Sequence, residues 1–293
     1  MIIAFVILHY KDAIVTSECM DSIIHMMKVE EYRIIVVDNA SQNGSLEKLK
    51  ERYASCRNID WIENCENLGF SRGNNIGYRY AKEKYDPEYI LIGNNDLIFQ
   101  QKDFVEILQQ EWLHTKFDVA GPDIENLEGI HQNPHRESLC SIGQVKKRIR
   151  NKKILLAVLK LKKRIKPLRK IQILEKIYLQ RGKRKKEVYR KERQKDVVLH
   201  GSCFIFSRSF IEREKEAFQE ETFLYYEEEI LALKCIKQGY ARWYLPELKV
   251  LHKEGASTEV TVEDELDRNI FVFSEQLKAE QKFLSLLVKH MKM

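Results

Sequence analysis

Apolar residues near the N-terminus form short uninterrupted runs that alternate with longer segments of helical periodicity. A run without polar alternation is typical of a strand covered on both faces, and a three-to-four-residue repeat is typical of an amphipathic helix. Strands and helices that alternate in this way predict a parallel α/β sheet with right-handed connections. The predicted strands lie near 2–8, 33–37, 59–62 and 89–93, and the predicted helices near 14–27, 45–54, 73–84 and 103–114.

The second half of the chain is less regular. A break at Gly121-Pro122 is followed by a loop that runs through Asn133-Pro134. Beyond it the pattern predicts a strand at 197–206, a loop leading into a helix at 223–238, short strands at 243–252 and a long amphipathic helix at 263–290. The predicted organisation is an α/β half at 1–120, a second half made of 121–145 and 196–262, an insertion at 146–195 and a C-terminal helix at 263–293.

Charge is distributed unevenly along the chain. The 293 residues carry a net charge of +6, but residues 146–195 contain 23 Lys and Arg against three Glu, a net charge of +20. The remaining residues contain 27 Lys and Arg against 41 Asp and Glu, a net charge of −14. A basic segment on an acidic body concentrates the attraction to an anionic partner in one patch.

The basic insertion contains apolar residues that repeat every three or four positions, which predicts two basic amphipathic helices separated by a proline. Two interpretations stay open: the segment lies on an anionic bilayer, or a helical pair packs on the body with its charges in water. Because the segment has almost no aromatic residues and the body is acidic, we expect no nucleic-acid binding. The apolar positions are Ile154, Val158, Leu161 and Ile165 before Pro167, and Leu168, Ile171, Leu174 and Tyr178 after it.

The six cysteines include no CxxC pair, which is typical of a cytoplasmic protein with reduced thiols. All apolar runs are shorter than the roughly 18 residues that a transmembrane helix needs. The first run lacks a basic leader and a small-residue cleavage site, so we expect a strand there and no signal peptide. The prediction is a cytoplasmic protein, peripheral at the inner face of the plasma membrane if the insertion binds lipid.

A single carboxylate follows the fourth predicted strand. Asn94, Asn95 and Asp96 come directly after the apolar run 89–93. Ligands of parallel sheets bind beyond the carboxyl ends of the strands, and a Mg²⁺ or Mn²⁺ ion that bridges phosphates needs few protein oxygens. A polar turn is an equally ordinary use of these residues, so the triplet indicates a metal site only together with its neighbours.

Other polar residues follow the neighbouring strands. Asp38 ends the second predicted strand, where a carboxylate can accept hydrogen bonds from a ribose hydroxyl or a base N–H, or can cap the next helix. His9 ends the first strand at the same edge. The segment 66–77 contains three glycines and Arg72 and runs into a helix, which suits a diphosphate, although the spacing matches neither a GxGxxG loop nor a Walker loop.

Taken in order, these motifs resemble the family 2 glycosyltransferases, particularly their rhamnosyltransferase-like bacterial branch. In the first half the resemblance lies in His9-Tyr10, Val37-Asp38-Asn39-Ala40-Ser41, Asn67-Leu68-Gly69-Phe70 with Gly73-Asn74-Asn75, and Asn94-Asn95-Asp96. In the second half it lies in Gly201-Ser202-Cys203, the segment 223–231, Gly239-Tyr240, and Val250-Leu251-His252 with Gly255-Ala256-Ser257. Several motifs in the right order are far more specific than any one of them. The resemblance covers nearly the whole chain except the insertion and the C-terminal helix.

The resemblance implies a GT-A fold, in which a Rossmann-like nucleotide-binding half with a mostly parallel central sheet adjoins an acceptor-binding half. It also implies that Asp96, with His252, helps to hold Mg²⁺ or Mn²⁺. Asn94 stands where the family commonly has the first acid of an Asp-x-Asp motif, which predicts a loosely held cation. The residues expected to line the nucleotide-sugar site are His9, Asp38, Asn67, Gly69, Arg72, Asn74 and Asn95.

The same resemblance places the general base in a pair of acids that opens a helix, here Glu227 and Glu228. Glu228 is the predicted base, and Glu229 is the alternative because three adjacent glutamates leave the register open. Acids at a helix N-terminus also simply complement the helix dipole. In an inverting transfer the base takes the proton of the acceptor hydroxyl while the nucleoside diphosphate departs.

The predicted function is an inverting, metal-assisted transfer of a sugar from a UDP- or dTDP-sugar to a saccharide or polyprenyl-diphosphate-linked acceptor, in the synthesis of bacterial capsule or O-antigen. One alternative is a nucleotidyltransferase of similar α/β fold. That class more often has a glycine-rich loop with a basic residue after the first strand, whereas His9-Tyr10-Lys11-Asp12 contains no glycine. The other alternative is a non-catalytic scaffold that holds a membrane or an acidic partner through its basic segment.

Overall fold

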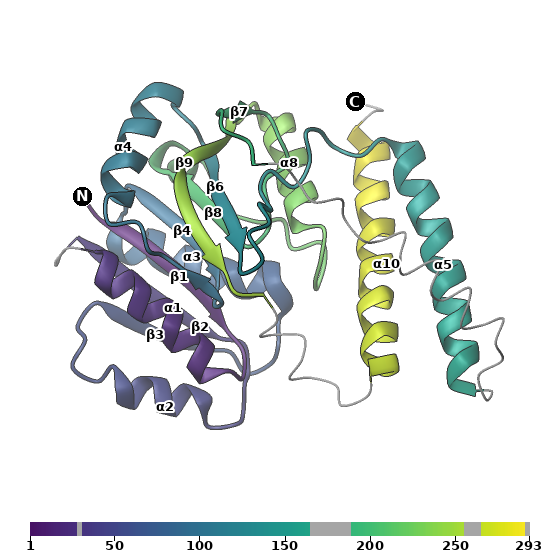
Figure 1. The fold of residues 1–293 in the computed structure, drawn as a ribbon, viewed down its shortest axis with the longest axis horizontal. Coiled ribbons are helices and arrows are strands. Elements are labelled where there is room, and N and C mark those ends of the chain that lie inside the picture. Colours follow the sequence, from purple (N-terminus) through teal and green to yellow (C-terminus); the bar gives the residue numbers. More distant parts are fainter. Residues whose placement is uncertain (28–30, 165–188, 255–264, 291–293) are drawn as a thin grey trace.

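The computed structural model describes residues 1–27, 31–164, 189–254 and 265–290, which form an α/β body with two long helices beside it (Figure 1). The strands are β1 (Ile3–His9), β2 (Tyr32–Asp38), β3 (Ile59–Glu63), β4 (Tyr89–Asn94), β5 (Leu97–Ile98), β6 (Val119–Asn126), β7 (Gln194–Lys195), β8 (Cys203–Ser207) and β9 (Arg242–His252). The helices are α1 (Ala13–Met26), α2 (Ser45–Arg52), α3 (Gly69–Tyr85), α4 (Phe104–Thr115), α5 (Ile142–Arg164), α7 (Arg208–Arg213), α8 (Glu227–Gln238) and α10 (Glu265–His290).

One sheet connects all the described strands, in the order β3-β2-β1-β4-β8-β6-β9-β5, with β7 paired to β9. The first four strands in this order are parallel to one another. The next strand, β8, runs antiparallel between β4 and β6, and β6 is parallel to β9. The predicted α/β fold with a mostly parallel central sheet is confirmed. The predicted boundary at residue 120 falls within β6, so the two predicted halves share this sheet.

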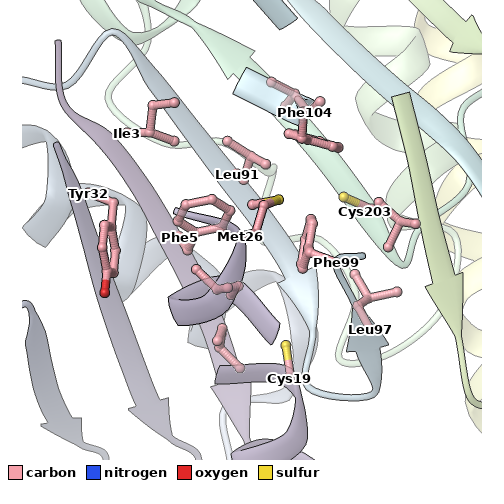
Figure 2. Close-up of a cluster of buried hydrophobic side chains, with 14 of the residues drawn as sticks. Ile3, Phe5, Cys19, Met26, Tyr32, Leu91, Leu97, Phe99, Phe104 and Cys203 are labelled. Carbon is pink, nitrogen blue, oxygen red and sulfur yellow. The ribbon is translucent and has the colours of Figure 1, made fainter. Parts of the chain in front are cut away.

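Helices cover both faces of the sheet, which explains why the central strands are apolar without alternation. Phe5 of β1 faces α1, α2 and α4, and its ring meets that of Phe99 edge to face with centroids 5.7 Å apart. Figure 2 shows this cluster, in which Leu91 of β4 and Phe104 of α4 lie near the same rings. Val6 points the other way, into a second cluster with α3, α7 and α8.

The two long helices α5 and α10 lie side by side next to α8 (Figure 1). A third apolar cluster joins them to α8. Lys152 of α5 lies in this interface, where its ammonium group is 2.8 Å from a carboxylate oxygen of Glu280 in α10. The buried members of the cluster include Val145, Ile149, Ile230, Ala279, Phe283, Leu286 and Leu287.

None of the helices in the ranges described above combines the length and the apolar character that a membrane crossing requires.

Several predicted elements differ from the structure in their extent. The predicted break at Gly121-Pro122 lies inside β6, which continues to Asn126, and the short strands predicted at 243–252 form the single strand β9. Helix α3 begins at Gly69, four residues before the predicted start, so most of the glycine-containing segment is helical. The predicted strand at 197–206 is reduced to β8, because the chain turns at Gly201 and Ser202 before β8 begins. Val198 is nevertheless buried and pairs with Arg136 in an isolated bridge.

The apolar stripe that the sequence predicted on the first basic helix is not the side of α5 that packs on the body. Ile154 and Leu161 of the predicted apolar stripe are 42% and 44% exposed. The residues that face α10 and α8 lie on the opposite side of the helix. The helix therefore carries two apolar stripes, and periodicity alone cannot tell which of them finds a partner. The second predicted helix of the insertion, at 168–178, lies outside the described residues.

Candidate functional site

The candidate site lies where the parallel strands end. His9 of β1 is in register with Asp38 of β2, and β4 ends at Asn94 beside them. The chain turns after β4 and forms β5, which pairs antiparallel with β9 so that Leu97 stands opposite His252. This pairing brings the C-terminal end of β9 to the turn that contains Asp96.

Asp96 and His252 face each other at this edge. Their side chains are buried, and Oδ1 of Asp96 is 3.2 Å from Nε2 of His252. Despite this proximity, Oδ1 of Asp96 has no hydrogen-bond partner among the described residues. The amide N–H of Lys253 donates to the carbonyl of Asp96 at 3.0 Å, which fixes the backbone between the two side chains.

A chain of hydrogen bonds fixes the ring of His252 from behind. Gln132 donates its Nε2–H to Glu254, whose other carboxylate oxygen accepts a hydrogen bond of 2.9 Å from Asn126. The amide oxygen of Gln132 therefore points at Nδ1 of His252, 2.8 Å away. An amide oxygen can only accept, so Nδ1 of the imidazole carries a proton. In the neutral ring, Nε2 then presents a lone pair to Asp96.

Two lone pairs that face each other are the arrangement a cation requires. The 3.2 Å separation is close to the roughly 3 Å edge of an octahedron with bonds of about 2.1 Å. Asp96 and His252 therefore fit a Mg²⁺ or Mn²⁺ ion as two adjacent ligands. No group of three or more His, Cys, Asp or Glu side chains that could hold a metal occurs among the described residues. Such an ion would take the rest of its shell from phosphate and water.

The three glutamates that begin α8 have different surroundings. Glu227 is buried, and its Oε1 has no hydrogen-bond partner among the described residues. The carboxylate of Glu229 is buried against Arg136, 2.7 Å from its Nε. Glu228 has the most exposed side chain of the three, at 18%, and its Oε1 is 3.6 Å from Nε2 of His135.

The surroundings also change the pKa values of these glutamates. Burial, and then the negative charge of Glu228, raise the pKa of Glu227 to about 8. Burial also raises the pKa of Glu229, while Arg136 and Arg148 oppose this effect. Glu227 is therefore uncharged at neutral pH, which limits the repulsion on a charged Glu228.

Glu227→Gln is expected to stabilise the fold more at pH 8 than at pH 5. In the unfolded chain Glu227 ionises near its ordinary pKa of 4.5, whereas in the folded protein it keeps its proton up to about pH 8. The wild type thus loses stability as the pH rises between these values, and the amide has no proton to lose. The expected gain is on the order of a few kcal/mol at pH 8, measured by denaturant unfolding. An equal effect at both pH values would contradict it, and Glu47→Gln on the exposed side of α2 is the control.

A row of three histidines connects the two parts of the site. The ring centroid of His200 is 5.9 Å from that of His252 and 6.1 Å from that of His135. The row therefore runs from Asp96, beside His252, to Glu228, beside His135. The sequence motifs missed His135 and His200, as they missed Gln132 and Glu254. Their only signal is position, because His135 follows Asn133-Pro134 and His200 precedes Gly201.

Two residues predicted to contact the nucleotide point into the protein. His9 is fully buried, and its two ring nitrogens lie 2.7 Å from Oγ1 of Thr16 and 2.8 Å from Oγ of Ser45. Burial lowers the pKa of His9, although Asp38 opposes the effect. Asn95 is also buried and donates to the same Thr16 hydroxyl at 2.9 Å. In this structure His9 and Asn95 hold the strand ends together, and their direct contact with a nucleotide stays a prediction.

Asp38 and Asn67 organise the turns of the site edge. Asp38 accepts hydrogen bonds from the backbone N–H of Ser41, at 3.2 Å, and from its hydroxyl. The side-chain oxygen of Asn67 accepts from Nδ2 of Asn39 at 2.8 Å and from the N–H of Gly69 at 2.9 Å. These contacts attach the start of α3 to the end of β2. Their part in nucleotide binding stays a prediction.

The glycines of α3 serve packing. A Cβ on Gly69 would lie 2.1 Å from the carbonyl oxygen of Phe223, and φ at Gly69 is +75°. Arg72, one turn on, is 56% exposed at its side chain and lies 3.5 Å from Glu220. Asn74 donates to the carbonyl of Phe70 at 3.0 Å, and its own buried side-chain oxygen has no partner among the described residues. Arg72 and Asn74 therefore lie on the first turns of a helix rather than in an anion-binding loop.

Solved structures share this fold across nearly the whole chain. Residues 1–349 of TarS from S. aureus, in complex with UDP-GlcNAc, superpose with a TM-score of 0.55 at 13% identity, over 100% of this chain and 73% of that one. The mannosyltransferase PcManGT from Pyrobaculum calidifontis, in complex with GDP-Man and Mn²⁺, gives a TM-score of 0.53 at 13% identity, over 99% and 75%. At this identity the likeness shows the fold, and the predicted GT-A fold is confirmed.

Sequence relatives agree with the fold. A 101-residue stretch is 34% identical to the low-salt glycan biosynthesis hexosyltransferase Agl10 of Haloferax volcanii, and this stretch is 34% of the present chain and 30% of that protein. Residues 5–214, most of the chain, match the family described as glycosyl transferase family 2. The chain belongs to glycosyl transferase family 2.

Proposed function

We propose that this protein transfers a sugar from a UDP- or dTDP-sugar to a hydroxyl of a saccharide or lipid-linked acceptor, with inversion at the anomeric carbon and with help from Mg²⁺ or Mn²⁺. The observation that supports it best is the continuous set of side chains from Asp96 and His252 to Glu228. It combines a site for a cation and diphosphate with a partly exposed carboxylate, the two parts that an inverting transfer needs.

The donor side of the proposal rests on Asp96 and His252. When bound there, a divalent cation supplies positive charge that offsets the charge of the departing diphosphate. Asp96 contributes a buried carboxylate oxygen without a hydrogen-bond donor, and His252 contributes an imidazole nitrogen whose orientation Gln132 fixes. With two protein ligands, we infer that the cation binds mainly together with the nucleotide. Asp38, Asn67, Gly69, Arg72 and Asn74 stay the proposed neighbours of the nucleotide.

The acceptor side rests on Glu228. We infer that its carboxylate takes the proton of the acceptor hydroxyl as the oxygen attacks the anomeric carbon. Attack opposite to the leaving diphosphate inverts the configuration at that carbon. Nearby His135 favours one orientation of the carboxylate, and the protonated Glu227 beside it carries no competing charge at neutral pH. Neither of the other two glutamates has a comparably exposed side chain.

The acceptor class follows from the relatives and stays a proposal. One relative is named as a hexosyltransferase of glycan biosynthesis, and a solved structure of this fold contains UDP-GlcNAc. These support assembly of a surface polysaccharide such as a capsule or O-antigen. A polyprenyl-diphosphate-linked acceptor would place the reaction at a membrane surface.

Calorimetric titration of UDP and dTDP tests the donor part of the proposal. We expect binding in the presence of Mn²⁺ and much weaker binding after its removal with EDTA. Release of nucleoside diphosphate from UDP- and dTDP-sugars then separates a transferase from a scaffold that only binds. Formation of pyrophosphate from a nucleoside triphosphate and a sugar phosphate, with no release from the nucleotide sugars, would favour the nucleotidyltransferase alternative.

Gln132→Leu is expected to weaken the Mn²⁺-dependent binding of UDP or dTDP by about 10- to 100-fold. Without the amide oxygen, Nδ1 of His252 loses its acceptor, and the ring is no longer held with Nε2 toward Asp96. Calorimetry in the presence of Mn²⁺ measures the change, and Gln110→Leu on the exposed side of α4 is the matched control. Equal affinity in wild type and Gln132→Leu would remove Gln132 from this role.

A further inference from the structure

One side of helix α5 packs against α8 and α10. Val145 and Ile149 are buried in the cluster with α8 and α10, and Leu155, Leu156 and Leu159 are also buried. Two cations on this side have partners: Lys152 is 2.8 Å from Glu280 and donates to Gln276 at 2.9 Å, and Arg148 donates to the hydroxyl of Tyr226 at 3.3 Å.

The opposite side of α5 combines exposed cations with exposed aliphatic side chains. Ile154 and Leu161, two turns apart, are 42% and 44% exposed. Residues at spacings of three, four and seven share one face of a helix, so these two lie in line with Lys147 and Arg150. The helix contains no Asp or Glu. This basic face consists of Lys146, Lys147, Arg150, Lys153, Ile154, Lys160 and Leu161, all exposed.

We propose that the basic face of α5 docks on an anionic lipid bilayer, with the helix axis parallel to the membrane. The cations would lie among the lipid phosphates, and the side chains of Ile154 and Leu161 would enter the boundary between headgroups and acyl chains. The proposal does not depend on the transfer chemistry of the candidate site.

The shape of the face fits a bilayer. A helix of 23 residues is roughly 34 Å long and presents a straight convex surface, which can lie along a planar membrane. Cations alone would suit many anionic partners. The aliphatic side chains between them stabilise binding only to a partner in which they can leave water. In Figure 1, α5 stands at the side of the molecule farthest from α2 and α4, so a membrane can reach it without meeting those helices.

The charge of the rest of the chain supports the same orientation. Residues outside 146–195 carry 27 Lys and Arg against 41 Asp and Glu. An anionic surface repels such a body and attracts α5, so the two effects together turn the helix toward the membrane.

Nucleic acid fits this face less well than lipid. Surfaces that bind single-stranded nucleic acid combine cations with aromatic platforms for the bases, and α5 contains no Phe, Tyr or Trp. Aliphatic side chains such as Ile154 and Leu161 find no apolar layer on a phosphate backbone.

Vesicle flotation with the full chain tests the proposal. We expect binding to vesicles of phosphatidylcholine that contain about a third phosphatidylglycerol, weakening with salt, and little binding to phosphatidylcholine alone. Lys147→Glu with Arg150→Glu should lower the partition coefficient at least about 25-fold, because each cation near the surface contributes roughly fivefold. Lys48→Glu with Lys102→Glu makes the same charge change on α2 and before α4, and it should retain binding within a few fold of wild type.

A second variant tests the aliphatic part. Ile154→Gln with Leu161→Gln changes no charge and keeps good helix formers at exposed positions, so the fold is retained. We expect it to bind anionic vesicles more weakly than wild type while remaining sensitive to salt. Equal binding to both kinds of vesicle, or unchanged binding of the Lys147→Glu, Arg150→Glu variant, would overturn the proposal. Salt-sensitive binding to a short RNA without any binding to anionic vesicles would overturn it as well.

Discussion

Glu228→Gln is expected to lower turnover by about 10²- to 10⁴-fold while nucleotide binding in the presence of Mn²⁺ is retained. The amide keeps the shape of the side chain but cannot accept the proton of an attacking hydroxyl. Release of nucleoside diphosphate from a nucleotide sugar, with water in place of the natural acceptor, measures the change. Calorimetric titration of the same nucleotide confirms that the donor site is intact.

Substitution of the neighbouring glutamate shows which of the adjacent acids is the base. Glu229→Gln removes the charge that is paired with Arg136. We therefore expect its main effect on the free energy of unfolding and a smaller effect on turnover per folded molecule. Glu47→Gln on α2 is the control for an exposed carboxylate. Full turnover in Glu228→Gln, together with a large loss in a stable Glu229→Gln variant, would move the base to Glu229.

Asp96→Asn is expected to reduce Mn²⁺-dependent nucleotide affinity and turnover together, each by about a hundredfold or more. The substitution preserves the size of the side chain, but it removes the negative charge that faces His252 at 3.2 Å. Calorimetric titration of UDP or dTDP with and without Mn²⁺ measures the effect. We expect the weak metal-independent binding to be little changed, because the charge acts through the cation.

The matched control for this variant is Asp103→Asn, at the exposed start of α4, where the side chain makes no capping hydrogen bond. A wild-type protein that binds UDP or dTDP equally with and without Mn²⁺ would contradict the metal assignment. Equal Mn²⁺-dependent binding in Asp96→Asn and wild type would remove Asp96 as the ligand and leave the metal itself in place.

The sequence predicted the parallel part of the fold well because each central strand is buried on both faces. The predicted strand at 2–8 corresponds to β1, Ile3–His9, and that at 89–93 to β4, Tyr89–Asn94. Once such strands are placed in a parallel sheet, their carboxyl ends share one edge. This rule brought Asp96 and Asp38 to the same edge, although it did not show which side chains at that edge are buried, as those of His9 and Asn95 are.

Contacts between distant segments were beyond prediction from the sequence. Gln132 and Glu254 become important only because β5 pairs with β9 and places His252 against Asp96. The histidine row has the same origin, since His135 and His200 come from two separate loops that meet in the fold. A single imidazole in a loop carries no periodic signal.

The buried side of α5 shows a different limit. Apolar residues recur at helical spacing on both sides of this helix, so the sequence left open whether the stripe of Ile154, Val158 and Leu161 packs on the body or faces a bilayer. In the structure α10 and α8 instead contact the side that carries Val145 and Ile149. The choice depends on the partner helices α8 and α10. Both come after the insertion, far from α5 in the sequence.

We propose that the edge formed by Asp96, His252 and Glu228 transfers a sugar from a nucleoside diphosphate sugar. The release of nucleoside diphosphate from a panel of UDP- and dTDP-sugars, followed with the wild-type protein, tests this proposal. We predict time-dependent release from at least one of them that stops with EDTA, returns with Mn²⁺ and is lost in Glu228→Gln. Release at the same rate in EDTA and in Glu228→Gln, or no release across the panel from a folded protein, would contradict metal-assisted sugar transfer with Glu228 as the base.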